Sequence, residues 1–308
     1  MQQTTDKRTL TPEPERGSGR RGRHFREEWI GRIFTSVSVV LLLAVIISIV
    51  FFVSSKGLSS FLESGISLKE FLTGRNWSPD TSFGALPFIA GSFAVTLLAA
   101  LIAAPLSLAA ALFMTEIMPG RGRRILQPAV ELLSGIPSVV YGFVGLSVIV
   151  PVIRSVFGGQ GFGILAGCLV LAVMILPTIT SIMADALASV PAGLRESSYA
   201  LGATRWQTIY RALIPAVLPS LLTGVVLGMA RAFGEALAVQ MVIGNAPHVP
   251  SSLVESASTL TSAITLSMGN TAAGSAHNNA LWSMALVLML MTLVFVLLVR
   301  MLDRRNRV

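Results

Sequence analysis

The sequence of 308 residues has one cysteine and few charges. Asp, Glu, Lys and Arg make up 12 % of it, about half of the ~25 % that is usual in soluble domains. Cys168 lies alone in an apolar stretch, which excludes a disulfide framework and a thiolate metal site. His24, His248 and His277 lie in separate polar segments without ligand spacing, so no metal site is expected. With 53 % hydrophobic residues, this composition excludes a water-soluble enzyme.

Six stretches contain no charge and are long enough for the ~20 residues of a membrane-spanning helix. They predict an all-α membrane protein with one transmembrane domain over residues 33–300. The Arg-, Gly- and Pro-rich residues 1–32 are expected to form a disordered basic tail, and residues 301–308 a second tail. The first stretch is too long for a cleaved signal peptide. The predicted spans are residues 33–53, 90–114, 131–152, 162–184, 213–233 and 281–300.

The basic residues are distributed unevenly among the segments between these spans. Eighteen of the 23 lie in the two tails and in the second-to-third and fourth-to-fifth loops, against four in the other loops. The positive-inside rule therefore predicts that both termini are cytoplasmic. The net charge of +8 is therefore explained by the topology of the chain. Attraction to membrane lipid is a secondary effect, and no nucleic-acid partner is expected.

The cytoplasmic loop over residues 185–212 carries signals for two short helices. Ser189 is a candidate N-cap for a helix that begins near Pro191. Gly202 is the residue type that ends a helix in the left-handed conformation. Thr204 and Gln207 have the spacing of a capping box that opens a second helix. A loop built in this way is expected to dock a cytoplasmic protein; the alternative is a loop that packs only on itself.

The same loop contains a set of residues in a characteristic order and spacing: Glu196, Ala200, Leu201, Gly202, Arg205, Trp206 and Pro215. In this order and spacing they resemble the "EAA" loop of the permease subunits of bacterial ABC importers. Ser197 and Ser198 replace two alanines of the family pattern, and Ala212 replaces a branched aliphatic residue. In that family the loop fits a groove on the ATPase subunit. The resemblance predicts an ATPase-coupling surface made of Glu196, Ser197, Ser198, Ala200, Leu201, Gly202, Arg205 and Trp206.

Three further segments narrow the resemblance to the phosphate-specific importer permeases, PstC-type rather than PstA-type. They are Trp77-Ser-Pro with Phe83–Ile89, the run Glu131–Phe143, and the run Arg231–Asn245. The resemblance implies a six-helix core like that of type I ABC importers (MetI-like) in the bacterial inner membrane. It also implies three partners: a PstA-type permease, a PstB-type ATP-binding dimer and an extracytoplasmic PstS-type phosphate-binding protein.

The chain has no phosphate-binding P-loop of its own. That motif needs a lysine after a glycine, and neither Lys7, Lys56 nor Lys69 follows one. We therefore expect a transport subunit without catalytic residues or a bound cofactor, and ATP is used by the partner ATPase. Two alternatives remain at this stage: a permease for sulfate or molybdate, and a secondary transporter, although no inverted halves are evident.

Arg231 and Glu235 are the predicted substrate-pathway charges. Four residues apart on one helix, they would share a face and could pair, and Arg has a fork of donors suited to phosphate oxygens. Two alternatives compete: Arg231 reaches the outer interface as a snorkelling side chain, or the pair is structural only.

The third span is the other predicted part of the pathway. Pro137 removes a helical hydrogen bond, and broken helices are tolerated where they line a polar cavity. Ser134, Ser138 and Tyr141 are the pathway candidates there, with tight helix packing as the alternative.

Overall fold

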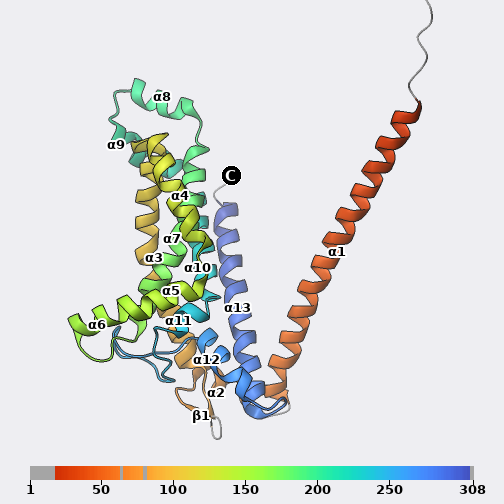
Figure 1. The fold of residues 1–308 in the computed structure, drawn as a ribbon, viewed down its shortest axis with the longest axis vertical. Coiled ribbons are helices and arrows are strands. Elements are labelled where there is room, and N and C mark those ends of the chain that lie inside the picture. The colour runs from red at the N-terminus through yellow and green to blue at the C-terminus, as the bar shows by residue number, and fades with distance from the viewer. Residues whose placement is uncertain (1–17, 63–64, 79–81, 306–308) are drawn as a thin grey trace, which may run out of the picture. The chain divides into compact units, whose positions relative to one another are not determined.

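The computed structural model describes residues 18–62, 65–78 and 82–305, and it divides the chain into two compact units, residues 1–52 and 53–308. Among the described residues, all the regular secondary structure is helical except for one pair of two-residue strands (Figure 1). The first elements are α1 (Ser18–Leu62), α2 (Leu68–Thr73), β1 (Trp77–Ser78), β2 (Ser82–Phe83), α3 (Leu86–Leu112), η1 (Phe113–Ile117), α4 (Arg121–Gly135), α5 (Ser138–Val144), η2 (Gly145–Ile149) and α6 (Val150–Phe157). The others are α7 (Ile164–Ala188), α8 (Ala192–Ala200), α9 (Arg205–Thr208), η3 (Ile209–Leu213), α10 (Ile214–Phe233), α11 (Leu237–Gln240), α12 (Leu260–Ser267), η4 (Met268–Asn270) and α13 (Ala276–Arg305).

Six helical stretches in the described residues are long and apolar enough to cross a membrane, which confirms the predicted all-α class. Several consist of consecutive elements, because η1 extends α3, α5–η2–α6 are continuous, and α9–η3–α10 are continuous. The stretches are Gly31–Leu62, Leu86–Ile117, Ser138–Phe157, Ile164–Ala188, Arg205–Phe233 and Ala276–Leu297.

Helix extends into both predicted tails. Residues 18–32 were expected to be disordered, but they form the first turns of α1; residues 1–17 lie outside the described residues. Helix growth is cooperative, so a long apolar helix can continue into flanking residues of good propensity. At the other terminus α13 continues through Arg305, and residues 306–308 lie outside the described residues.

The third predicted span, 131–152, is divided in the structure. α4 ends at Gly135, Ile136 is extended with φ −71° and ψ 130°, and α5 begins at Ser138. Pro137 causes the break because it has no N–H and disfavours the helical conformation of the residue before it. The helix of membrane-crossing length is therefore Ser138–Phe157.

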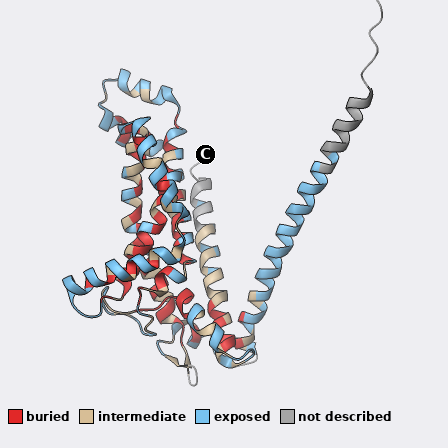
Figure 2. Ribbon diagram, viewed as in Figure 1, coloured by how far each residue is buried: buried red, intermediate tan, exposed pale blue. Residues whose placement is uncertain are grey.

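The core of the second unit is α7, which packs between α3 and α10 (Figures 1 and 2). The α7 side chains of Leu171, Ile175 and Ile179 are fully buried. Small residues on both neighbours allow this close packing. A Cβ atom added at Gly228 of α10 would lie 2.6 Å from the Ile179 side chain, and on α3 the residues Ala99, Ala103 and Ser107 are completely buried.

A second apolar cluster lies where the strand pair, α2, α12 and the start of α13 meet. Phe71, Leu260 and Leu281 are completely buried there. The Trp77 ring packs edge-on against Phe88, with ring centroids 5.3 Å apart. We call this end of the second unit the α12 end, and the opposite end, which carries α8 and α9, the α8 end.

The segment that leads into α12 lies directly against α3. A Cβ atom on Gly91 would lie 2.1 Å from the backbone carbonyl oxygen of Ser258. The Leu260 N–H donates to Ser92 Oγ over 3.0 Å. Only a glycine at position 91 leaves room for this contact.

We expect Gly91→Ala to lower the thermal unfolding temperature of the detergent-solubilised protein, because the methyl group must displace backbone. Overpacking of this kind costs about 1–3 kcal/mol. Gly135→Ala is the matched control: nothing lies within 4 Å of a Cβ at this last residue of α4, so the added methyl group displaces nothing. Equal unfolding temperatures for the two variants would contradict the packing described here.

Candidate functional site

α8 and α9 form an exposed pair of short helices at the α8 end. The predicted capping box is confirmed: Thr204 N–H donates to Gln207 Oε1 over 2.8 Å, and Gln207 N–H donates to Thr204 Oγ1 over 3.3 Å. Gly202 has φ +80°, the left-handed conformation predicted for it. The prediction that Ser189 caps this helix was wrong. Pro191 is the N-cap residue of α8, and Ser189 Oγ donates to the Ala186 carbonyl over 2.7 Å instead.

The surface of this pair is apolar and open. α8 has no buried residue, so the alternative of a loop packed on itself finds no support from its side chains. Leu201 is 89 % exposed and Trp206 67 % exposed. A hollow of about 480 Å³ lies between the helices, lined by residues that include Leu194, Leu201 and Gln207. Of the eight predicted coupling residues only Ser198 is half-buried; the exposed ones are Glu196, Ser197, Ala200, Leu201, Gly202, Arg205 and Trp206.

Ser198 connects α8 to α9. Its Oγ lies 2.9 Å from Thr208 Oγ1, which also donates to the Thr204 carbonyl over 3.2 Å. The serine that departs from the family pattern at this position therefore makes a bond that an alanine cannot make.

Arg195 connects α8 to the end of α3, a contact that was not predicted from the sequence. Its Nη2 lies 2.7 Å from Glu116 Oε1 and also donates to the Leu187 carbonyl over 2.9 Å, while Nη1 donates to the Val190 carbonyl over 2.7 Å. Glu116 is only 7 % exposed. By accepting hydrogen bonds from the guanidinium, the Glu116 carboxylate raises the pKa of Arg195 above its usual value. The partners are 79 residues apart in sequence, so no local pattern could have paired them.

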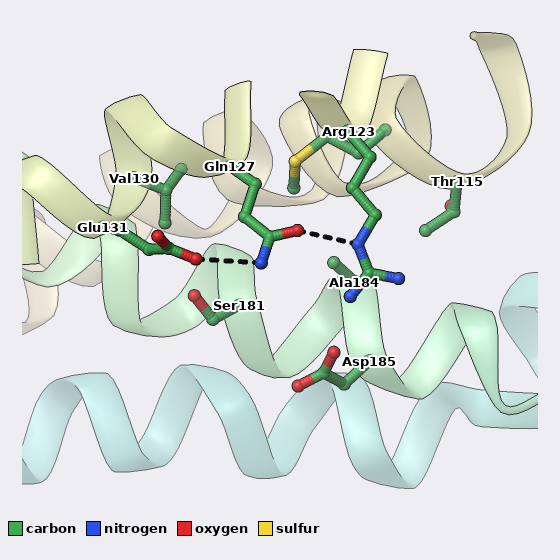
Figure 3. A pocket seen from close by; sticks show the side chains of 9 residues that line it. Thr115, Arg123, Gln127, Val130, Glu131, Ser181, Ala184 and Asp185 are labelled. Carbon is green, nitrogen blue, oxygen red and sulfur yellow. Dashed lines mark hydrogen bonds between the residues drawn. The ribbon is translucent and has the colours of Figure 1, made fainter. Parts of the chain in front are cut away.

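A polar cavity of about 210 Å³ lies between η1, α4 and α7 (Figure 3). Arg123 Nε donates to Gln127 Oε1, and Gln127 Nε2 donates to Glu131 Oε1, each over 2.8 Å. Asp185 of α7 lies across the cavity from this chain of side chains (Figure 3). Because both signs of charge line it, the cavity suits water better than a single anion.

Arg231 lies near the end of α10 and reaches α7. Its Nη1 donates to Thr178 Oγ1 over 2.9 Å. Thr178 is 14 residues after Ile164, about 21 Å along α7 at 1.5 Å per residue, and about 15 Å from its other end. The guanidinium therefore lies beside the middle of a membrane-crossing helix. A snorkelling side chain would place it at a helix end.

Glu235 does not pair with Arg231 in the described structure. α10 ends at Phe233, so Glu235 lies beyond the helix and does not share its face. Instead, Glu235 Oε1 accepts from the Ala238 N–H over 3.1 Å, at the start of α11. The expectation of an i, i+4 pair was wrong because Gly234 ends the helix between the two charges.

Tyr141 spans the break between α4 and α5. Its hydroxyl donates to the Leu133 carbonyl over 2.6 Å. In an unbroken helix that carbonyl would accept from residue 137, and Pro137 has no N–H. The phenol therefore replaces the missing helical bond.

The two serines predicted for the pathway, Ser134 and Ser138, make no described hydrogen bond to Arg231 or Thr178. Ser134 is exposed, and its Oγ donates to the Glu131 carbonyl over 2.8 Å. Ser138 is half-buried at the start of α5. The structure thus brings Arg231 and Thr178 together, and no described hydrogen bond joins Ser134, Ser138, Tyr141 or Glu235 to Arg231. Thr178 was missed because nothing in its sequence surroundings distinguishes it from other helical threonines.

Comparison with known proteins identifies the family. Residues 103–308 match the family described as the inner membrane component of binding-protein-dependent transport systems. The chain belongs to this family: it is the permease subunit of an ABC importer, a multi-pass inner-membrane protein and a transport subunit rather than an enzyme.

Two relatives match nearly the whole chain. It is 58 % identical over 286 residues to the probable ABC transporter permease protein YqgH of Bacillus subtilis, covering 92 % of this chain and 93 % of that protein. It is 36 % identical over 293 residues to the phosphate transport system permease protein PstC of Pasteurella multocida, covering 88 % and 89 %.

Two solved structures share the fold. A bacterial ABC transporter involved in alginate import matches with a TM-score of 0.64 at 16 % identity, covering 93 % of this chain and 99 % of that chain. The methionine transporter MetNI in an inward-facing conformation matches with 0.55 at 20 % identity, covering 70 % and 92 %. At these identities the likeness shows the fold alone.

We expect Ser198→Ala to loosen α8, because it removes the bond to Thr208. A side-chain hydrogen bond contributes about 0.5–1.5 kcal/mol, which corresponds to amide exchange in residues 192–200 that is about two- to tenfold faster. Ser197→Ala, next to it, is the control, because no described hydrogen bond involves its exposed side chain. Hydrogen–deuterium exchange measures both variants. Equal exchange would show that the Ser198 bond contributes nothing to the position of α8.

Proposed function

We propose that this chain conducts inorganic phosphate through the membrane as the PstC-type permease subunit of an ATP-driven importer. The observation that carries the proposal is the position of Arg231 beside the middle of α7, held by Thr178. An ionisable side chain at such a depth is costly, and by default it indicates a functional site. The similarity to PstC proteins at 36 % identity supports phosphate as the anion.

The chemistry of this arrangement suits a tetrahedral oxyanion. A guanidinium cannot lose its charge in a protein and presents its donors in a fixed fork. Thr178 uses one Nη donor of Arg231, which leaves other donors for substrate oxygens. Tyr141 and the serines Ser134 and Ser138 are the proposed polar lining at the α4–α5 break. Glu235 is the proposed counter-charge to Arg231, acting at longer range than a direct ion pair.

The partners and the orientation follow from the same proposal. The exposed apolar surface of α8 and α9 fits a protein partner, and we assign it to one subunit of a PstB-type ATPase dimer, where ATP is bound and hydrolysed. The α8 end and both termini then face the cytoplasm. A PstA-type permease completes the pathway, and a PstS-type binding protein delivers phosphate to the α12 end.

We expect Arg231→Gln to abolish phosphate uptake while the complex still assembles, because glutamine keeps polarity but loses the charge. Uptake of labelled phosphate and of labelled sulfate by starved cells measures the effect. Arg121→Gln removes the same charge from an exposed position on α4 and should leave uptake unchanged. Normal uptake of both phosphate and sulfate in Arg231→Gln would rule out the proposed pathway. Normal phosphate uptake with loss of sulfate uptake would keep the pathway and change the substrate.

We expect Thr178→Val to reduce uptake at least tenfold, because valine keeps the shape but removes the oxygen that accepts from Arg231. Thr178→Ser, which keeps the hydroxyl, should retain most of the activity. The same uptake assay, normalised to the amount of permease in the membrane, measures both variants. If valine transports as well as serine, Thr178 does not position Arg231.

A further inference from the structure

We propose that the ion pair between Arg195 and Glu116 is a strut that transmits movement of α8 to α3, so that Arg195 and Glu116 are positioning residues for coupling. The inference rests on the proposed function in one respect, that α8 is the docking site of the ATPase. It adds a specific mechanical connection between that surface and the helix core.

The strut is fixed firmly at both ends. The Arg195 guanidinium donates to the Glu116 carboxylate and to the carbonyls of Leu187 and Val190, so three acceptors hold it in place. Charge-assisted bonds of this kind are short and strong. Glu116 is 7 % exposed, and an isolated carboxylate at that burial would be costly. The pair is therefore expected to stay together while α8 moves.

The rest of α8 is attached more loosely. No α8 residue is buried, and the other described side-chain bond from α8 joins two neutral hydroxyls, Ser198 and Thr208. Apart from the chain itself and its packing on α9 and η3, α8 is therefore held by charge-assisted bonds among the described residues only through Arg195, and this connection leads to α3.

η1, the segment that carries Glu116, has space to move. Glu116 lies in η1, a π-helical turn that continues α3. Such turns are frequent at functional sites. The preceding residues of η1, Met114 and Thr115, line the polar cavity of about 210 Å³, which leaves space for η1 to shift. α3 packs along α7, the helix that carries Thr178.

The test uses the complete importer in proteoliposomes: this chain, its partner permease, the ATPase dimer and the phosphate-binding protein. The quantity measured is the coupling ratio, which is the ATPase rate with phosphate-loaded binding protein divided by the basal rate. We expect Glu116→Gln and Arg195→Gln each to lower this ratio at least fivefold, with the basal rate within twofold of the unmodified complex. A purely structural role would lower both rates together and leave the ratio unchanged, and that result would overturn the proposal.

Three further variants define the result. The double variant Glu116→Gln with Arg195→Gln should be no worse than Arg195→Gln alone, because partners in one interaction are not additive. Arg195→Lys should fail to restore coupling, since an ammonium cannot reproduce the planar fork. Arg121→Gln, an exposed arginine at the same end, should keep the full ratio. Additive losses in the double variant would overturn the strut. If Glu116→Gln does not assemble, Glu116→Asp keeps the charge with a shorter reach and serves in its place.

A cross-linking measurement separates the strut from the docking assignment. Cys168 is the one native cysteine and is buried, so Leu201→Cys in a Cys168→Ala background gives a single exposed thiol on the docking surface. Cross-linking of this thiol to the ATPase subunit, together with a lowered ratio in Glu116→Gln, supports both proposals. Cross-linking with an unchanged ratio overturns the strut alone. An active complex that gives no cross-link overturns the docking assignment and the strut with it.

Discussion

The organisation of the helix core depends on one constraint: inside a membrane, backbone polar groups must find their hydrogen-bond partners within the protein, and polar side chains help to supply them. The Leu133 carbonyl, which Pro137 deprives of its helical donor, receives the Tyr141 hydroxyl. Ser107 Oγ of α3 donates to the Leu176 carbonyl of α7 over 3.1 Å. Arg231 donates to Thr178. These contacts join helices that a membrane, unlike water, does not drive together by the hydrophobic effect.

Close packing supplies the second part of that organisation. α7 is the most buried of the six candidate spans, and its neighbours carry alanine and glycine where they face it. A single methyl group added at Gly91 or Gly228 would meet an occupied position. Small residues thus bring the helices close enough for short side chains such as Ser107 and Thr178 to bridge them. The polar contacts and the small-residue packing depend on each other.

Much of the fold could be predicted from the sequence because its signals are local. Uncharged stretches marked the membrane-crossing helices, and the capping box at Thr204 and the left-handed Gly202 marked the ends of short ones. Pro137 was identified as a break, although the extent of the interruption depended on the conformation of Ile136. Arg231 was selected by its charge within a predicted span, by its spacing to Glu235 and by the donor fork of its guanidinium.

The remaining features depend on residues that are distant in sequence. The pairing of Arg195 with Glu116 and that of Arg231 with Thr178 each join different helices, 79 and 53 residues apart. The wrong i, i+4 pair arose from assuming that α10 continues through Gly234. A glycine within a predicted helix is compatible with continuation or with termination. Here the helix ends at Phe233, and Glu235 makes one local bond, from Ala238 N–H, and one long-range bond, from the Thr261 hydroxyl to the Glu235 carbonyl.

The proposed docking surface and the proposed pathway are both bonded to α7. The Leu187 carbonyl, which accepts from Arg195, and Thr178, which accepts from Arg231, both lie on α7. They are nine residues apart, about 14 Å along the helix at 1.5 Å per residue. Pro177 immediately precedes Thr178 and removes a backbone bond at that point. A displacement of the α8 end of α7 would therefore be carried by continuous helix up to Pro177, and the helix would bend there most easily. In this geometry Arg195 and Arg231 are both bonded to the segment of α7 that follows Pro177, so a displacement of that segment would move the acceptors of both side chains.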